Sequence, residues 1–145
     1  MKVTICGSIN FAEEMLRIRD ELERMGHEVF IPNSIKDFSI KNDGDARRFK
    51  ANRERYIGEL KPRYTMDHFK LVEKSDAILV VNMEKNGIDN YIGGATFAEV
   101  MLAFYLGKKI FLLNPVPSDS RLAVMRDEIE SVKPFVLNGD LEKIK

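Results

Sequence analysis

Five consecutive apolar residues, Ala77-Ile78-Leu79-Val80-Val81, restrict the possible fold of this chain more than any other feature. A continuous apolar run of this length predicts a strand that is covered on both faces. Strands of that kind occur in parallel sheets, where the connecting helices pack against the two faces of the sheet. The rest of the sequence should therefore alternate short strands with amphipathic helices.

The remaining segments show this alternation. Four further strands are expected at 3–6, 27–32, 109–113 and 134–137. The clearest helix begins at Phe11, because Phe11, Met15, Ile18, Leu22 and Met25 form one apolar stripe. Other helices are expected at 46–60, 66–74, 95–106 and 121–131, with a helical turn at 140–144. Pro62 should end or interrupt the second helix, and 33–44 has the composition of turns.

These elements predict a single α/β domain over residues 1–145, with a polar segment of variable length at about 33–63. The expected architecture is a flavodoxin-like three-layer sandwich with a five-stranded parallel sheet of order 2-1-3-4-5. Ligands bind such sheets at the carboxyl ends of the strands. The loops at 7–11, 82–94 and 114–118 should converge there.

Composition excludes several classes of partner and cofactor. The formal net charge is zero, so neither a nucleic acid polymer nor an anionic membrane is expected as partner. Cys6 is the only cysteine, which fits a reducing cytoplasm, and no Cys/His spacing indicates zinc or another metal. No cofactor motif is present. The N-terminal MKVTICGS reads as a strand, not a signal peptide, and no apolar run approaches the ~20 residues of a membrane span.

Two loops carry the candidate chemistry. Gly7-Ser8-Ile9-Asn10 precedes a helix, whose N-terminus can hold a phosphate or another anion, although Ser8 or an Asn10-x-x-Glu13 pattern could simply cap the helix. In the second loop, Glu99 follows a glycine pair. It completes a Thr96-x-x-Glu99 capping box, or it contacts a ligand at the edge of the sheet.

The segments CGSI, SDAILVV and IGGATFAEVMLAFYLGKKIFLL together resemble the nucleoside 2-deoxyribosyltransferase family, which includes hydrolases of deoxynucleoside 5′-monophosphates. The resemblance covers roughly residues 2–8 and 67–116. It implies that Glu99 attacks C1′ of the sugar or stabilises its developing positive charge. The substrate-binding residues suggested by these loops are Cys6, Gly7, Ser8, Asn10, Gly93, Gly94 and Asn114.

The chain departs from the family pattern at several positions. Thr4 replaces a tyrosine, His68 replaces the aspartate that acts on the leaving base, Gly93 replaces an aspartate or serine, and Asn10 replaces the arginine of the hydrolases. His68 or its neighbour Asp67 could still protonate a leaving base. His68 could equally be a solvent-facing helix residue, and Asp76 is expected only to cap or turn the chain.

Two function classes follow. The first is an enzyme that cleaves or transfers at the N-glycosidic bond of a nucleoside or nucleoside 5′-monophosphate, or a related sugar substrate. The second is a nucleotide-binding or sensing module without turnover. The basic residues Arg47, Arg48, Lys50, Arg53 and Arg55 could neutralise a phosphate or form a solvated helix face. A homo-oligomer is expected from the resemblance, with Phe97, Phe104 and Tyr105 either at its interface or packed within the monomer.

Overall fold

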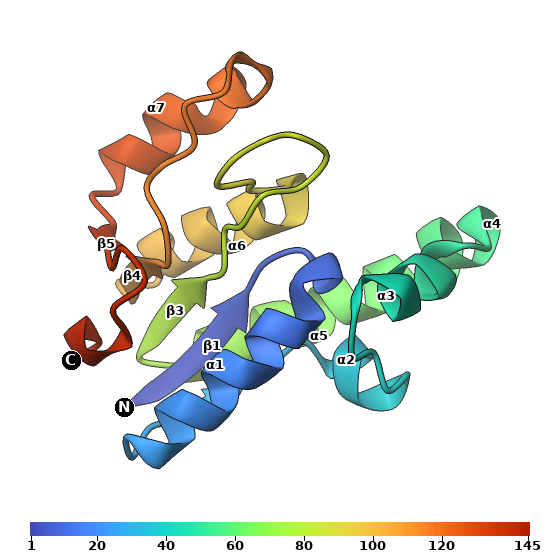
Figure 1. The fold of residues 1–145 in the computed structure, drawn as a ribbon, viewed down its shortest axis with the longest axis horizontal. Helices are drawn as coiled ribbons and strands as arrows, with labels where there is room; N and C mark the ends of the chain where they lie inside the picture. The colour runs from blue at the N-terminus through green and yellow to red at the C-terminus, as the bar shows by residue number, and fades with distance from the viewer.

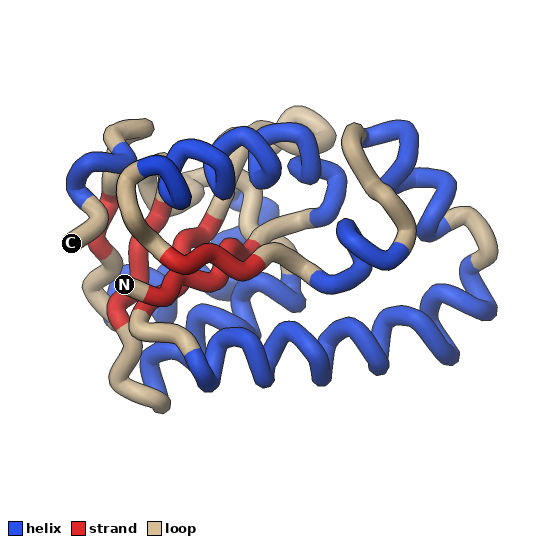
Figure 2. Tube along the Cα trace, turned by 90° about the horizontal axis from the view of Figure 1, so that it is seen from below, coloured by secondary structure: helices blue, strands red, loops and turns tan.

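In the computed structural model, which describes residues 1–145, five parallel strands form one sheet with helices on both faces (Figure 1, Figure 2). The strand order is β2-β1-β3-β4-β5, which confirms the predicted flavodoxin-like α/β architecture. The strands are β1 (Lys2–Cys6), β2 (Glu28–Phe30), β3 (Ala77–Val80), β4 (Lys109–Leu112) and β5 (Phe135–Val136). All five lie within two residues of the predicted ranges.

The central strand β3 separates two apolar clusters. Leu79 belongs to the cluster that contains Ile18, whereas Ile78 belongs to the cluster that contains Val100. Successive side chains of a strand point to opposite faces, so a strand between two helical layers needs apolar residues at every position. The apolar run at 77–81 is therefore covered on both faces, as predicted.

The helices divide between these two faces. The main helices are α1 (Ala12–Arg24), α2 (Asn33–Asp37), α3 (Asp43–Lys50), α4 (Arg53–Arg55), α5 (Lys61–Lys74), α6 (Gly94–Tyr105) and α7 (Ala123–Ser131). Short helical turns are η1 (Ile9–Phe11), η2 (Tyr56–Leu60), η3 (Ser120–Leu122) and η4 (Leu141–Lys143). Helices α1, α2 and α3 contribute to one apolar cluster, and α5, α6 and α7 contribute to the other. No helix is both long enough and apolar enough to cross a membrane.

Of the two outcomes predicted at Pro62, the helix does not end there, but its regular α-helical form is interrupted by a π-helical turn just before the proline. Helical conformation continues without a break from α4 through η2 into α5, and Figure 2 shows this long helix along one side of the sheet. Proline lacks the N–H that would bond to the residue four positions earlier. Here η2 is a π-helical turn, in which the Lys61 N–H donates to the carbonyl of Tyr56. The wider turn lets the chain pass Pro62 while remaining helical.

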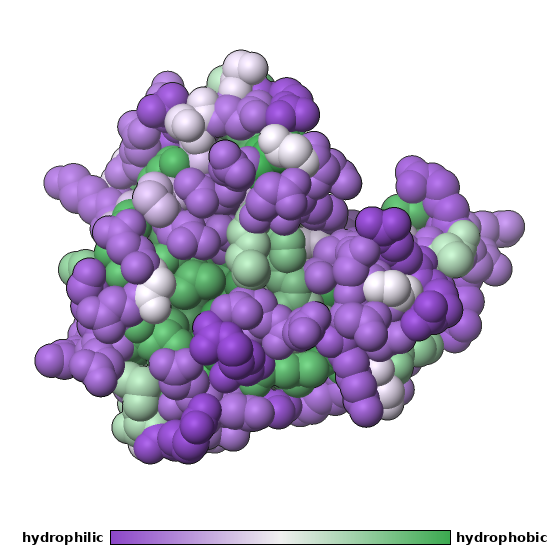
Figure 3. Space-filling model, in the orientation of Figure 1, coloured by the Kyte–Doolittle hydropathy of each residue, from purple (hydrophilic) through white to green (hydrophobic).

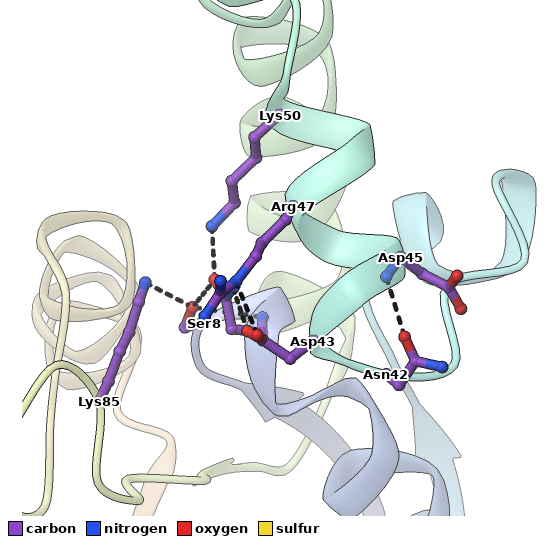
Figure 4. A network of polar contacts seen from close by, with 8 residues as sticks. Ser8, Asn42, Asp43, Asp45, Arg47, Lys50 and Lys85 are labelled. Carbon is purple, nitrogen blue, oxygen red and sulfur yellow. Dashed lines mark hydrogen bonds and ion pairs between the residues drawn. The ribbon is translucent and has the colours of Figure 1, made fainter.

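The segment 33–44 was expected to contain only turns, but it includes the short helix α2. Pro32 precedes this helix with a φ of −52°, and Ile35 is buried in the core, so tertiary packing fixes the turn of helix. Asn42 caps α3, because its side chain accepts a 2.9 Å hydrogen bond from the Asp45 N–H at the start of this helix (Figure 4).

Candidate active site

A cavity opens at the carboxyl ends of β1 and β3, where this sheet topology predicts a ligand site. Its walls come from the first loop, the end of α3, one face of α5 and the start of α6. The space-filling view is indented between the part that carries α7 and the arm formed by α3 and α4 (Figure 3). The lining residues are Gly7, Ser8, Ile9, Pro32, Ser34, Phe49, Lys50, Tyr56, Leu60, Lys61, Tyr64, Thr65, His68, Lys85, Tyr91, Gly93, Gly94, Ala95, Thr96 and Glu99.

Gly7 makes the tight turn out of β1 possible. A Cβ at this position would lie 2.8 Å from Cε of Met15 and 2.9 Å from the carbonyl oxygen of Val81. No side chain fits at that distance. Glycine therefore lets the first loop pack directly on the sheet and places Ser8 at the wall of the cavity.

Glu99 lies at the floor of the cavity and does not cap a helix. Helix α6 begins at Gly94, two residues before Thr96, and its N-cap Gly93 has no side-chain capping bond. The capping-box interpretation of Thr96 and Glu99 is therefore wrong. Glu99 is instead one and a half turns into α6 and only 6% exposed, because the helix packs between α5 and α7.

Burial raises the pKa of Glu99 to about 8, with opposing contributions from the Cys6 thiol and Lys61. Removing the carboxylate from water disfavours its charged form, and no cation forms an ion pair with it at close range. Cys6 at the end of β1 is fully buried beside Glu99, and burial raises its pKa well above the usual thiol range. Both groups therefore carry their protons at neutral pH.

His68 is buried on the cavity floor, so the solvent-facing alternative is wrong. It is 5% exposed and lies on the face of α5 that also presents Lys61, Tyr64 and Thr65 to the cavity. These positions follow helical spacing, and Asp67 falls outside that face and does not line the cavity. Burial lowers the pKa of His68 to about 4, so its imidazole is neutral at physiological pH.

His68 and Glu99 face one another without a bond. The separation between His68 Nε2 and Glu99 Oε2 is 3.9 Å, which is too long for a hydrogen bond. Neither ring nitrogen of His68 makes a hydrogen bond of good geometry, and these two are the only buried side-chain polar atoms without one. The Ile5 backbone lies near the ring and raises the pKa of His68 against the larger effect of burial. Unpaired buried polar atoms are rare because they cost stability, so a ligand, an ion or a water is expected to pair with these two nitrogens.

Three lysines give the rest of the cavity a positive charge. Lys50 comes from α3, Lys61 from α5 and Lys85 from the loop after β3. Burial, followed by the nearby charges of Lys85 and Lys61, lowers the pKa of Lys50 to about 8. Burial likewise lowers the pKa of Lys85. Their mutual repulsion indicates a site that is prepared for an anion.

Two of these lysines, from different elements, converge on the first loop (Figure 4). Lys85 Nζ donates a 3.0 Å hydrogen bond to Ser8 Oγ, and Lys50 Nζ donates a 2.7 Å bond to Asn10 Oδ1. Ser8 also caps η1 by accepting from the Asn10 N–H at 3.3 Å. The capping interpretation of Ser8 is thus confirmed, and its hydroxyl faces the cavity as well.

The other polar groups of this corner are paired away from the cavity. The amide nitrogen of Asn10 donates to Asp43, so the proposed capping partner of Asn10, Glu13, is not used. Asp43 also pairs with Arg47 at 2.7 Å, and both are exposed. Arg48 pairs with an acid of its own helix, and of the basic segment only Lys50 lines the cavity.

Lys85 is held by a tight hairpin inside the loop after β3. Lys85 and Ile88 exchange two backbone hydrogen bonds of 3.0 Å, and Asn86 and Gly87 between them both have positive φ. Asn-Gly is the preferred dipeptide for such a turn. Arg121 donates to the carbonyl of Gly87 at 3.2 Å and ties the hairpin to η3.

The space beside Gly93, just before α6, is occupied by the side chain of Tyr91. A Cβ at Gly93 would lie 3.2 Å from the hydroxyl oxygen of Tyr91. The phenol therefore occupies the space where the family resemblance places an aspartate or serine. Lys85 Nζ lies 5.0 Å from the centre of the Tyr91 ring, so the two residues form one wall of the cavity. Gly94 lines the cavity with open space around it.

Three other singled-out residues do not reach the cavity. Asn114 forms a reciprocal set of hydrogen bonds with Asn82 that joins the loops after β3 and β4. The Thr4 hydroxyl is used by Ser75 and by the carbonyl of Leu71, so it does not replace the family tyrosine. Asp76 accepts from the Lys2 N–H at 2.7 Å and has the local role that was predicted.

The comparisons with known proteins add no family assignment: no family model matches the chain, and no curated protein matches it. The resemblance described from the motifs therefore stays a prediction. Sequence reasoning missed Lys61, Lys85 and Tyr91. Helical spacing could have placed Lys61 on the same face of the helix as His68. The Asn-Gly turn next to Lys85 could have placed this lysine near the edge of the sheet.

Proposed function

We propose that this protein cleaves the N-glycosidic bond of a nucleoside 5′-monophosphate, either by hydrolysis or by transfer of the sugar to another base. The observation that supports this most is the position of Glu99, a buried carboxyl group at the floor of a cavity rimmed by lysines. The family resemblance assigns the same residue to attack on C1′.

Glu99 is suited to a reaction that builds positive charge on a sugar. Departure of the base leaves an oxocarbenium-like centre, which a nearby carboxylate stabilises or traps as a glycosyl-enzyme intermediate. Stabilisation of this kind is strongest where water is excluded, as it is around Glu99. With a pKa of about 8, the group must lose its proton before it can act as nucleophile.

The phosphate is assigned to the corner where Lys50 and Lys85 meet Ser8. Two ammonium groups and a hydroxyl can surround one phosphate, and charge-assisted hydrogen bonds are stronger than neutral ones. Binding a dianion there would also relieve the repulsion that lowers the pKa of Lys50. The arginine that the resemblance expects at Asn10 is thus replaced by lysines from other elements.

His68 is assigned to the leaving base. Its two ring nitrogens are unused in the protein, and a neutral imidazole offers one donor and one acceptor. A purine or pyrimidine ring needs such partners when it leaves the sugar with its extra electron pair. In this arrangement the sugar lies between the lysine corner and Glu99.

Base release tests the proposal directly. The wild-type protein, Glu99→Gln and the matched control Glu73→Gln, whose side chain is exposed on α5, would be incubated with nucleosides and their 5′-monophosphates. Free bases would be followed by chromatography, with and without a second base as acceptor. We expect release by wild type and Glu73→Gln, and none by Glu99→Gln. Retained release in Glu99→Gln would exclude Glu99 as the reacting group.

One observation favours a second candidate, a nucleotide-binding module without turnover. Burial keeps Glu99 mainly protonated at neutral pH, and a protonated carboxyl group can donate a hydrogen bond to a base or sugar but cannot attack it. This candidate predicts that 5′-monophosphates raise the melting temperature while no base is released at any pH. Release that increases with pH would exclude it.

A further inference from the structure

The cavity floor combines three side chains that no sequence spacing connects. Cys6 ends β1, His68 lies in the middle of α5, and Glu99 lies in α6. The sulfur, an imidazole nitrogen and a carboxylate oxygen all lie within 4.8 Å of one another, and all three residues are buried. The absence of a Cys/His motif made a metal site unexpected, because these residues come together only in the folded chain.

We propose that Cys6, His68 and Glu99 bind one thiophilic divalent ion, of which Zn²⁺ is the best fit. A thiolate, an imidazole and a carboxylate are the three ligand types that zinc prefers. Because Cys6 and Glu99 are protonated at neutral pH, binding of the ion displaces both protons to solvent. The unpartnered nitrogens of His68 are the second observation that points to a ligand, because the ring is buried and directed at the other two groups.

The geometry needs only small side-chain movements. With Zn–N and Zn–O near 2.0 Å and Zn–S near 2.3 Å, tetrahedral ligands lie roughly 3.3–3.6 Å apart. His68 Nε2 and Glu99 Oε2 are already 3.9 Å apart, and the largest separation in the group is 4.8 Å. The ligand atoms must therefore approach one another by roughly 0.3–1.5 Å, which is a movement of side chains and not of the backbone.

The fourth position of the ion would face the cavity. His68 and Glu99 both line the cavity, whereas Cys6 lies behind them and is completely buried. Three protein ligands with one open position allow an ion to enter and exchange from the cavity side. Metal binding does not depend on the proposed function. If that function holds, the ion would occupy the oxygen of Glu99 and block base release.

Cobalt spectroscopy and zinc competition test the site without any nucleotide. Co²⁺ would be added to the wild-type protein, because a cysteine ligand gives a thiolate-to-cobalt charge-transfer band in the near ultraviolet. Zn²⁺ affinity would be measured against a chromophoric chelator. The variants are Cys6→Ala and His68→Gln, and the control is His27→Gln, the second histidine, which contacts the N-terminus instead.

We expect one ion per chain, a charge-transfer band in wild type and His27→Gln, and no such band in Cys6→Ala. Zn²⁺ affinity should fall more than about tenfold in Cys6→Ala and His68→Gln. If Cys6→Ala does not fold, the His68→Gln titration and the wild-type spectrum still decide. A wild-type protein without the band, or equal Zn²⁺ affinity in wild type and His68→Gln, would overturn the proposal.

Discussion

His68 Nε2 faces Glu99 Oε2 across 3.9 Å, and burial keeps both groups neutral between about pH 4 and pH 8. A neutral imidazole and a protonated carboxyl group at this distance are not an ion pair, although their types would allow one. Both residues line the cavity, so a bound molecule or ion can pair with the ring nitrogens that the protein leaves without a partner.

Burial of Glu99 predicts a specific dependence of stability on pH. The pKa of Glu99 rises from 4.5 in the unfolded chain to about 8 in the folded protein, so the native state holds the proton more tightly. Between these values the unfolded state binds fewer protons, and the free energy of unfolding must fall as pH rises, by at most about 1.4 kcal/mol per pH unit.

Thermal or chemical unfolding of wild type and Glu99→Gln from pH 4 to pH 9 measures this effect. The stability of wild type relative to the variant should decrease between about pH 4.5 and pH 8 and be constant outside that window. The control Glu73→Gln should show a constant difference from wild type. A flat difference for Glu99→Gln would mean that Glu99 is solvated in the native protein.

The lysine corner predicts discrimination between nucleotides and nucleosides. Lys50→Gln and Lys85→Gln should each weaken binding of nucleoside 5′-monophosphates by roughly ten- to hundredfold, because each variant loses an ammonium donor to the proposed phosphate. Binding of the nucleosides should be almost unchanged. Calorimetry or fluorescence titration would measure both, with Lys70→Gln on the exposed side of α5 as control. Equal losses for nucleosides and nucleotides would exclude a phosphate site here.

Much of the fold could be predicted because its signals are local. The apolar run of β3 and the stripe of α1 each specify one element without reference to the rest of the chain. The errors fall where tertiary structure overrides local preference. Pro62 stays inside a helix because a π-helical turn precedes it, and α2 forms because Ile35 is buried.

The site was predictable only in part, for a physical reason. Ser8 lies in the loop after β1, and the loop after β3 leads into the helix that carries Glu99, so parallel topology brings both residues to one edge of the sheet. Lys50 at the end of α3 and Lys61 at the start of α5 reach the same cavity because the chain turns back between these two helices, which no short pattern encodes. The neutral state of Glu99 depends on packing by α5 and α7, and therefore on the three-dimensional structure.

Replacement of Gly7 by alanine should strongly reduce the free energy of unfolding. Gly7→Ala would place a methyl group 2.8 Å from Met15 Cε and 2.9 Å from the Val81 carbonyl oxygen. The methionine can move, but the backbone carbonyl cannot, so we expect a loss of more than about 2 kcal/mol in unfolding free energy. Gly94→Ala, where a Cβ meets nothing within 4 Å, is the matched control and should be near neutral. Similar stability for both variants would contradict the close packing of the first loop.

The end of α6 predicts self-association. Tyr105 is 85% exposed and Phe104 is 51% exposed, whereas Phe97 packs against the core, so packing within the monomer accounts for only one of the three aromatics. If the expected homo-oligomer uses this end of the helix, Tyr105→Glu should lower the measured mass of the wild-type assembly. Light scattering after size-exclusion chromatography would show it, with Lys108→Glu as a control for added negative charge. A monomeric wild type would exclude the oligomer.

Replacement of His68 should raise the stability of the protein while it removes base release. Its buried, unpartnered nitrogens cost stability, and a leucine of similar size has no polar atoms to satisfy. We expect His68→Leu to gain about 1 kcal/mol at pH 7 and to lose base release. The gain should grow below pH 6.5, because wild type alone loses stability as pH falls through 6.5 toward the folded pKa of about 4. Unfolding curves at pH 5 and pH 7 measure both quantities, and a His68→Leu protein that is less stable at both would show that the imidazole has a partner in solution.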